Sequence, residues 1–394
     1  MSNNGERIAI ISAGQTRFGE HWESSLRSLA SQAIFGAINS VDNGLSVSEI
    51  DGLVVSNTSS DTLNGQNNLA SLIADHSGLK NISAVRVEAA DASGGVAIRT
   101  GYYMIKSGLI NTVLICGVEK MTDQTEAATL TSIISQSLDA EWEALQGQTL
   151  AGAYALIAKA HFRQYGTTNR MMAAVSAKNH SNATYNRMAQ FRRAFTIDQI
   201  LKSSYVAEPI TLLDSAPSSD GSAAIILTKE SLAKKYTDSP VFIEGSGQAT
   251  DTISLHDREN MARFKATQLA GEQAFKQAKL KPSDIKVAEV HDSFSIGEIL
   301  AIEDLKFFPE GKGGPATLDN ETTIGSDKVV VNPSGGLKAL GHPLGATGVA
   351  QAVEIFHQLR NSVEKERQTD AEIGLTQSVG GIGSTVAVHI YKRG

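Results

Sequence analysis

Residues 331–350, VNPSGGLKALGHPLGATGVA, contain the pattern on which the fold of this chain depends. A strand-like run of three valines ends in Asn-Pro, and a glycine-rich loop carrying His342 leads into amphipathic helical spacing over residues 349–360. Glycines let a backbone approach a ligand closely, and a helix start offers free N–H groups and the positive end of a dipole. The stretch therefore predicts a strand–loop–helix unit with a site at the start of its helix.

A shorter version of this pattern occurs at residues 88–97, EAADASGGVA. A strand-like segment, a turn of small residues and a helix ending at Gly108 follow one another there. The triplet Ala-Ser-Gly at 92–94 aligns with Ala-Thr-Gly at 346–348, and Val-Ala follows each closely. Two matching units predict an internal duplication in which both helix starts face one site.

The composition narrows the class of protein. The chain has 394 residues, with 41% hydrophobic and 20% charged, as in a globular protein. A net charge of −7 gives no basic footprint for nucleic acid or an anionic membrane, and no apolar run reaches the roughly 18 residues of a bilayer span. The single cysteine, Cys116, excludes an intramolecular disulfide and is consistent with a reducing compartment. We expect a cytoplasmic protein without nucleic-acid or membrane partners.

The order of elements predicts an α/β fold in two halves. Apolar strand-like runs such as residues 112–121 alternate with segments of helical spacing. The segment 122–206 breaks this alternation and reads as a mostly helical insertion. We predict an N-terminal half formed by 1–121 and 207–235, a loop domain at 122–206, and a C-terminal half at 236–394.

Two histidines are candidates for catalysis. His342 lies beside a glycine turn at a helix start, where an imidazole can deprotonate a nucleophile or stabilise an anion. His291 follows a strand-like run, and strand ends in α/β sheets usually present site residues. It is placed to donate a hydrogen bond to a substrate carbonyl, with Ser293 as a proton shuttle. The alternatives are a loop histidine among structural glycines and a surface histidine beside a capping Asp292.

Three further sequence features give weaker indications of function. The segment 378–385, SVGGIGST, forms either an oxyanion hole from backbone N–H groups or a simple hairpin turn. Cys116 lies in an apolar strand and reads as a buried, inert thiol. The Arg192–Arg193 pair binds a phosphate or forms a solvated basic turn, and the turn is favoured.

Taken together, these motifs resemble the thiolase superfamily, particularly its sterol-carrier-type and archaeal acyl-CoA thiolase branch. The resemblance covers nearly the whole chain, in family order, through ASGG (92–95), GVEKMTD (117–123), SDGSAA (219–224), HDSF (291–294) and NPSGGLKALGHPLGATG (332–348). It implies a five-layered αβαβα fold of two duplicated halves plus a mostly helical loop domain. It also implies a homodimer or tetramer, a coenzyme A thioester as substrate, no permanently bound cofactor and no metal.

The resemblance also assigns site residues. The family places a nucleophilic cysteine at the helix N-terminus, beside the histidine of the GHP motif, and that position in this sequence is Asp91. A carboxylate is a weak nucleophile, and its acylation gives a reactive anhydride instead of a storable thioester. Ser293 and Ser378 occupy positions where relatives have cysteine. The full expected site comprises Asp91, His291, Ser293, His342 and Ser378, with Gly335, Gly336, Gly341, Gly380 and Gly381 contacting the substrate.

Three functions stay open at this point. The expected one is a thiolase-like acyl-CoA acyltransferase that performs Claisen condensation or thiolysis of 3-oxoacyl-CoA, because both histidines are retained. The second is a non-covalent retro-aldol or retro-Claisen lyase with Asp91 or a histidine as general base. The third is an inactive acyl-CoA-binding scaffold subunit. Archaeal-type thiolases assemble with a hydroxymethylglutaryl-CoA synthase and a small OB-fold acyl-CoA-binding protein, so the resemblance implies these two partners.

Overall fold

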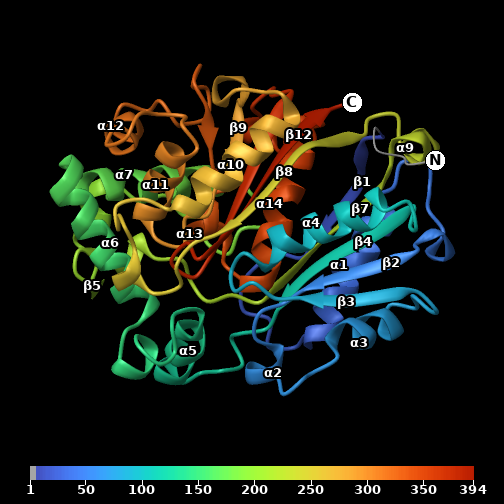
Figure 1. Ribbon diagram of the computed structural model, residues 1–394, viewed down its shortest axis with the longest axis horizontal. Coiled ribbons are helices and arrows are strands. Elements are labelled where there is room, and N and C mark those ends of the chain that lie inside the picture. Colours follow the sequence, from blue (N-terminus) through green and yellow to red (C-terminus); the bar gives the residue numbers. More distant parts are fainter. Residues whose placement is uncertain (1–5) are drawn as a thin grey trace.

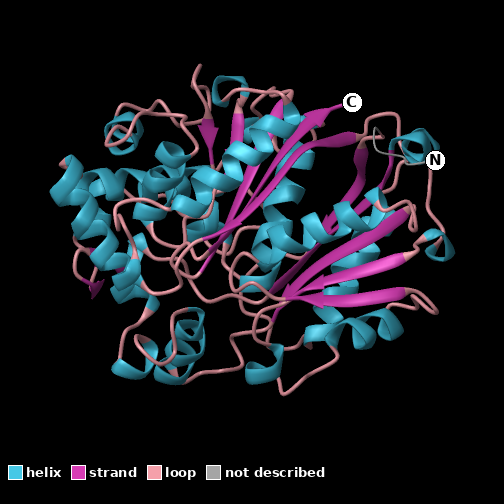
Figure 2. Cartoon of the chain, in the orientation of Figure 1, coloured by secondary structure: helices cyan, strands magenta, loops and turns pink. Residues whose placement is uncertain are grey.

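A computed structural model describes residues 6–394, so the first five residues of the predicted N-terminal half lie outside the described part. Within residues 6–394 the strands form a ten-stranded sheet in the order β10-β9-β11-β12-β8-β1-β7-β4-β2-β3 and a small sheet of β5 and β6 (Figures 1 and 2). The strands are β1 Ile8–Gln15, β2 Gly52–Ser56, β3 Ser83–Val87, β4 Thr112–Glu119, β5 Tyr205–Ala207, β6 Ile210–Thr211, β7 Gly221–Lys229, β8 Val241–Thr250, β9 Val287–Glu289, β10 Val330–Val331, β11 Ile373–Gly380 and β12 Thr385–Arg393.

The two halves of the large sheet repeat one topology. The order β3-β2-β4-β7-β1 in the first half corresponds strand by strand to β10-β9-β11-β12-β8 in the second. In each half the first two pairings are parallel and the last two are antiparallel. The halves join through a short antiparallel pairing of β1 with β8, in which Ile8 lies opposite Ile243. The predicted duplicated α/β fold is confirmed.

Helices lie between the two strand groups and on their outer faces (Figure 1). Helices α4 Ser93–Lys106 and α14 Leu344–Leu359 share one buried core with strands of both halves. A second core packs α1 Leu26–Asn39 and α3 Leu69–His76 against the outer face of the first half. A third core packs the remaining large helices against the second half. Each half of the large sheet thus buries apolar side chains on both of its faces, and the covering helices form separate layers.

Helix α14 differs from the amphipathic helix expected over residues 349–360. It begins earlier, at Leu344, and every residue except His357 is buried. A helix between two strand groups has no solvent face, so its polar residues Thr347, Gln351, Glu354 and Gln358 are buried and hydrogen-bonded inside the protein. The loop before it also contains a short helix, α13 Gly336–Leu340, where the sequence predicted only loop.

Strand β9 is shorter than the expected strand, and the reason bears on the site. Beyond Glu289 the backbone stops pairing with its neighbours. The N–H of Val290 donates to Asn332 Oδ1 at 2.8 Å, and the N–H of His291 donates to Gln377 Oε1 at 2.9 Å. Side chains thus replace ladder hydrogen bonds, and the chain leaves the sheet at His291.

The segment 122–206 contains α5 Ala127–Ile134, α6 Leu150–Tyr165, α7 Asn169–Ala183 and α8 Ile197–Leu201. It is mostly helical, as expected, while the three-part domain division stays a prediction. The other helices are α2 Ser60–Leu63, α9 Glu230–Tyr236, α10 Lys265–Ala278, α11 Ser295–Asp304 and α12 Gly313–Leu318. No helix in the described part of the chain is long and apolar enough to cross a membrane.

Candidate active site

Asp91 lies in the tight turn that connects β3 to α4. The Ser93 hydroxyl donates to the Ala90 carbonyl at 2.6 Å and accepts from the Ala89 N–H at 2.8 Å. Ala90 has a positive φ of 49°, a conformation that costs a non-glycine residue about 1 kcal/mol. The turn thereby directs Asp91 into the protein, where it is 1% exposed.

Two histidines from the second half meet this carboxylate. His342 Nε2 lies 3.8 Å from Asp91 Oδ2, and His291 Nε2 lies 4.0 Å from the same oxygen. The two imidazole rings are nearly perpendicular, with centroids 5.1 Å apart. Both histidines are buried, so the surface alternative for His291 is wrong, whereas His342 does lie in the loop between α13 and α14.

The hydrogen bonds around His342 favour one tautomer. The Thr347 hydroxyl lies 3.0 Å from the Pro343 carbonyl, which can only accept, and 2.8 Å from His342 Nδ1. When the hydroxyl donates to the carbonyl, it accepts from Nδ1–H, and the lone pair of Nε2 faces Asp91. Proton transfer between these two residues needs this orientation.

His291 is held by its backbone instead of its ring. Its neighbour Asp292 turns the other way and accepts from Lys338 Nζ at 3.2 Å, from Asn179 Nδ2 at 2.7 Å and from the Leu337 N–H at 2.7 Å. Burial first, and then the charges of His342 and Lys338, hold the pKa of His291 well below its usual value. His291 is therefore neutral near pH 7.

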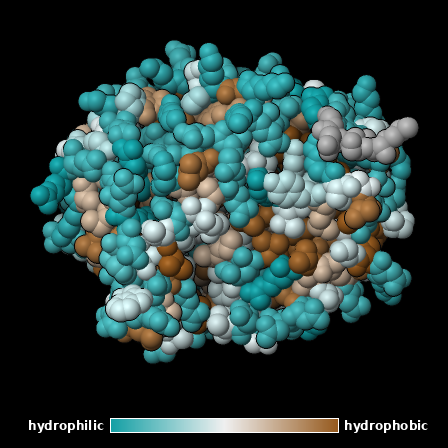
Figure 3. All heavy atoms as spheres, in the orientation of Figure 1, coloured by the Kyte–Doolittle hydropathy of each residue, from teal (hydrophilic) through white to brown (hydrophobic). Residues whose placement is uncertain are grey.

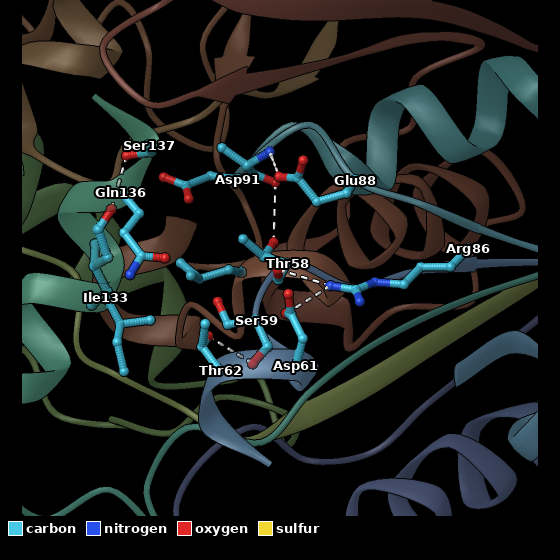
Figure 4. A pocket seen from close by; sticks show the side chains of 13 residues that line it. Thr58, Ser59, Asp61, Thr62, Arg86, Glu88, Asp91, Ile133, Gln136 and Ser137 are labelled. Carbon is cyan, nitrogen blue, oxygen red and sulfur yellow. Dashed lines mark hydrogen bonds and ion pairs between the residues drawn. The ribbon is translucent and has the colours of Figure 1, made fainter. Parts of the chain in front are cut away.

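Asp91 borders two cavities. The apolar one, of about 560 Å³, is also lined by His342 and Ser293, and its volume lies in the range of ordinary small-molecule sites. Its apolar lining includes Met121, Ile134, Leu150, Val206, Phe294 and Leu344. A second, more polar cavity of about 440 Å³ lies on the other side of the turn. Figure 4 shows it, with the Asp91 carboxylate directed away from Arg86.

The glycine turn after β11 packs against the Asp91 turn. A Cβ on Gly380 would lie 2.5 Å from the Ala89 carbonyl oxygen, and a Cβ on Gly381 would lie 2.7 Å from the Ser137 carbonyl oxygen. Gly381 also has a positive φ of 55°, which favours glycine. The turn therefore packs against the segment that carries Asp91, but Gly380 and Gly381 line neither cavity beside it, and their contact with substrate stays a prediction.

The other predicted residues lie elsewhere. Ser378 is buried in β11, where its hydroxyl donates to Gln351 at 2.9 Å, and it lines neither cavity beside Asp91. Gly335, Gly336 and Gly341 also line neither cavity. Added Cβ atoms there would collide with Ala183, Asp292 and Ser219, respectively. Packing and positive φ account for these three glycines, and their contact with substrate stays a prediction.

Sequence reasoning missed the residues that hold the site together. Glu119 accepts N–H groups of Thr58, Ser59 and Gly345, each at 2.9 Å, and so ties the start of α14 to the first half. Burial raises the pKa of this carboxyl. Thr347 supports His342 within the same motif. The partners of Glu119 are about 60 and more than 200 positions away in sequence, so no local pattern reveals them.

Comparisons with known proteins identify the class. The model of the N-terminal thiolase domain matches residues 8–231, and the model described as thiolase C-terminal domain-like matches residues 247–393. The chain therefore belongs to the thiolase family.

Relatives and solved structures agree with this assignment. An acetyl-CoA acetyltransferase of Methanothermobacter thermautotrophicus is 48% identical over 98% of this chain and 99% of that protein. Sterol carrier protein 2 of Gallus gallus is 33% identical over 98% of this chain and 72% of that protein. A structure titled Ltp2-ChsH2(DUF35) aldolase superposes with a TM-score of 0.84 at 23% identity, covering 98% of this chain and 97% of that one. The last likeness establishes the fold alone.

Proposed function

We propose that this protein binds acyl-CoA thioesters and acts as a thiolase-type acyltransferase that makes or breaks the carbon–carbon bond of a 3-oxoacyl-CoA without an acyl-enzyme. One observation carries the proposal: the Asp91 carboxylate lies between two histidines at the wall of an apolar cavity. Relatives named acetyl-CoA acetyltransferase support the reaction class.

A carboxylate at this position favours base catalysis over acyl storage. Attack by Asp91 on a thioester would give a mixed anhydride, which water destroys easily. As a base, Asp91 takes a proton from the α-carbon of one thioester. The carbanion attacks the carbonyl of the second thioester, the new C–C bond forms as the C–S bond breaks, and the leaving coenzyme A thiolate receives the proton. Both substrates must then be bound together.

The surrounding groups suit this chemistry. His291 is neutral, so its N–H can stabilise a developing oxyanion without introducing a positive charge. The lone pair of His342 Nε2 can share the proton that Asp91 removes. The mostly apolar lining of the cavity lowers the local dielectric and strengthens both interactions.

Initial-rate kinetics with intact-mass spectrometry test the proposal. We expect a sequential pattern and no mass increase after incubation with acetyl-CoA or acetoacetyl-CoA, while free coenzyme A is released. Asp91→Asn should lower turnover by about 10²–10⁴-fold. The matched control is Asp61→Asn, because Asp61 lines the polar cavity but pairs with Arg86. A stable acyl adduct on the wild-type protein would contradict the non-covalent step, and saturable binding without turnover would favour the scaffold function.

A lyase is the second candidate. The only thiol in the chain, Cys116, is buried in β4, and burial raises its pKa to about 12. A retro-aldol cleavage needs no nucleophile, because a base removes the proton of a β-hydroxyl group and the α-carbanion leaves. Release of a carbonyl product from a 3-hydroxyacyl-CoA, without cleavage of 3-oxoacyl-CoA, would select this alternative.

We also propose that the protein forms a homodimer or tetramer. Strand β3 is an edge strand of the large sheet, and Val85 on it is 40% exposed. Figure 3 shows apolar atoms gathered on the part of this face where β3 and α4 lie. Exposed edges of this kind are usually covered by another chain. Light scattering after size-exclusion chromatography tests this; a monomer would contradict it.

The hydroxymethylglutaryl-CoA synthase, the OB-fold partner and the cytoplasmic location stay predictions. The aldolase structure with the same fold contains a DUF35 component, according to its title. We propose a partner of that kind for this chain, and co-purification with such a protein tests it.

A further inference from the structure

The cluster of Asp91, His291 and His342 contains buried polar atoms that lack partners. Asp91 Oδ2, His342 Nε2 and both ring nitrogens of His291 have no hydrogen bond within residues 6–394. In the tautomer of His342 that Thr347 favours, the Nε2 lone pair and the Asp91 carboxylate are two acceptors facing each other. Leaving buried acceptors unsatisfied costs about 1–3 kcal/mol each. The arrangement calls for a positively charged or proton-bearing group between them.

We propose that this group is a divalent transition-metal ion of the Zn²⁺ class, bound by Asp91 Oδ2, His291 Nε2 and His342 Nε2. Two imidazoles and one carboxylate are a donor set that suits such ions. The three ligand atoms come from both halves of the chain and lie within 4.8 Å of one another. The sequence predicted no metal, because these residues are 200 and 51 positions apart.

The spacing requires a small contraction. Metal–ligand bonds of about 2.0–2.1 Å place tetrahedral ligands about 3.4 Å apart. The two distances from Asp91 Oδ2, 3.8 and 4.0 Å, exceed this value by a few tenths of an ångström. The separation between the ligand nitrogens of His291 and His342, up to 4.8 Å, must close by up to about 1.4 Å. His291 can move because no hydrogen bond holds its ring.

The surroundings also fit a metal site. Metal-bound histidines usually donate their second ring N–H to an oxygen, as His342 does to Thr347. The charge of Lys338, a buried lysine that acts on His291, is already balanced by Asp292. Asp91 and His342 line the apolar cavity, so an open coordination position would face it. An ion there would polarise a thioester carbonyl, leaving the second oxygen of Asp91 free as a base.

The first test is metal content, which does not depend on any acyl-CoA reaction. Protein treated with a chelator is dialysed against Zn²⁺ and analysed by mass spectrometry for bound metal. We expect one equivalent per chain. Asp91→Asn and His342→Ala should weaken binding at least about 100-fold, and Thr347→Val about 10-fold. Co²⁺ should give a visible absorption band in the wild-type protein that these variants lose.

The matched control is His256→Ala. His256 lies 3.9 Å from Glu143 and 3.7 Å from Asp257, but its side chain is 56% exposed. His256 should bind Zn²⁺ no tighter than any surface histidine, and His256→Ala should leave the metal content of the protein unchanged. Circular dichroism verifies that each variant is folded. The proposal is overturned if the wild type binds no metal, or if metal persists in folded Asp91→Asn and His342→Ala. Acyl-CoA turnover in metal-free protein would leave the proposed function intact and separate the two claims.

Discussion

The two strand–turn–helix units of this protein share a frame but differ in how the chain reaches the helix. In the first half, β3 leads into α4 through a short turn held by the neutral hydrogen bonds of Ser93. In the second half, β10 leads into α14 through an added helix, α13, held by the buried ion pair of Lys338 with Asp292. The duplication produces matching helices, whereas the two connections differ. One places Asp91 and the other places His342 at the same site.

The largest expected effect comes from placing a thiol on the first unit. In Asp91→Cys the introduced thiol lies at a helix start beside two histidines, whereas Cys116 is buried with a pKa of about 12. Iodoacetamide should label the introduced thiol at least about 10³-fold faster than Cys116, and acetyl-CoA should acylate it. Peptide mass spectrometry distinguishes the two positions. Failure of both reactions in folded protein would show that the groups around position 91 do not activate a thiol.

The second unit should depend strongly on its ion pair. Lys338→Met leaves a buried carboxylate without its cation, and we expect a loss of about 3–5 kcal/mol in the free energy of unfolding. The control is Lys306→Met, which removes an exposed pair with Glu272 and should cost no more than about 1 kcal/mol. Urea denaturation measures both. Equal losses would mean that packing alone holds α13.

The contact between the units can be broken at a glycine. A Cβ on Gly348 would lie 2.5 Å from the backbone nitrogen of Gly95. Gly348→Ala should therefore cost about 2–3 kcal/mol, because the helices α4 and α14 must separate. Gly36→Ala is the control. Gly36 lies on the exposed face of α1 and its Cβ would meet nothing closer than 3.5 Å, so stability should rise by up to about 1 kcal/mol. A tolerated alanine at position 348 would contradict the close contact.

The smallest effect is expected in the first unit's turn. Ser93→Ala removes two hydrogen bonds beside Asp91 and should cost about 1–2 kcal/mol. Ser107→Ala at the other end of α4 should change stability by less than about 0.5 kcal/mol, because that serine is exposed. Thermal unfolding compares them. A larger loss of unfolding free energy in Ser93→Ala than in Lys338→Met would contradict the prediction that the second connection depends more strongly on its polar contacts.

The sequence predicted the strands and helices near the site because short local patterns encode them. The alignment of Ala92–Gly94 with Ala346–Gly348 also anticipated a physical contact, since Gly94 and Gly348 touch across the two halves. The sequence did not predict that α14 begins at Leu344 and is buried on all sides. It also did not predict that β9 ends at Glu289, because the next backbone N–H groups bond to Asn332 and Gln377. These errors arise where distant segments set the environment.

The sequence by itself determined the family, the duplication and the identity of the polar residues at the site, because motif order and glycine spacing are local properties. Only the tertiary structure decided that Asp91, His291 and His342 meet, that the tautomer of His342 with its proton on Nδ1 is favoured, and that His291 is neutral. These features depend on burial and on contacts between residues far apart along the chain. Position in space, not residue type, sets which of these groups accepts a proton or binds an ion.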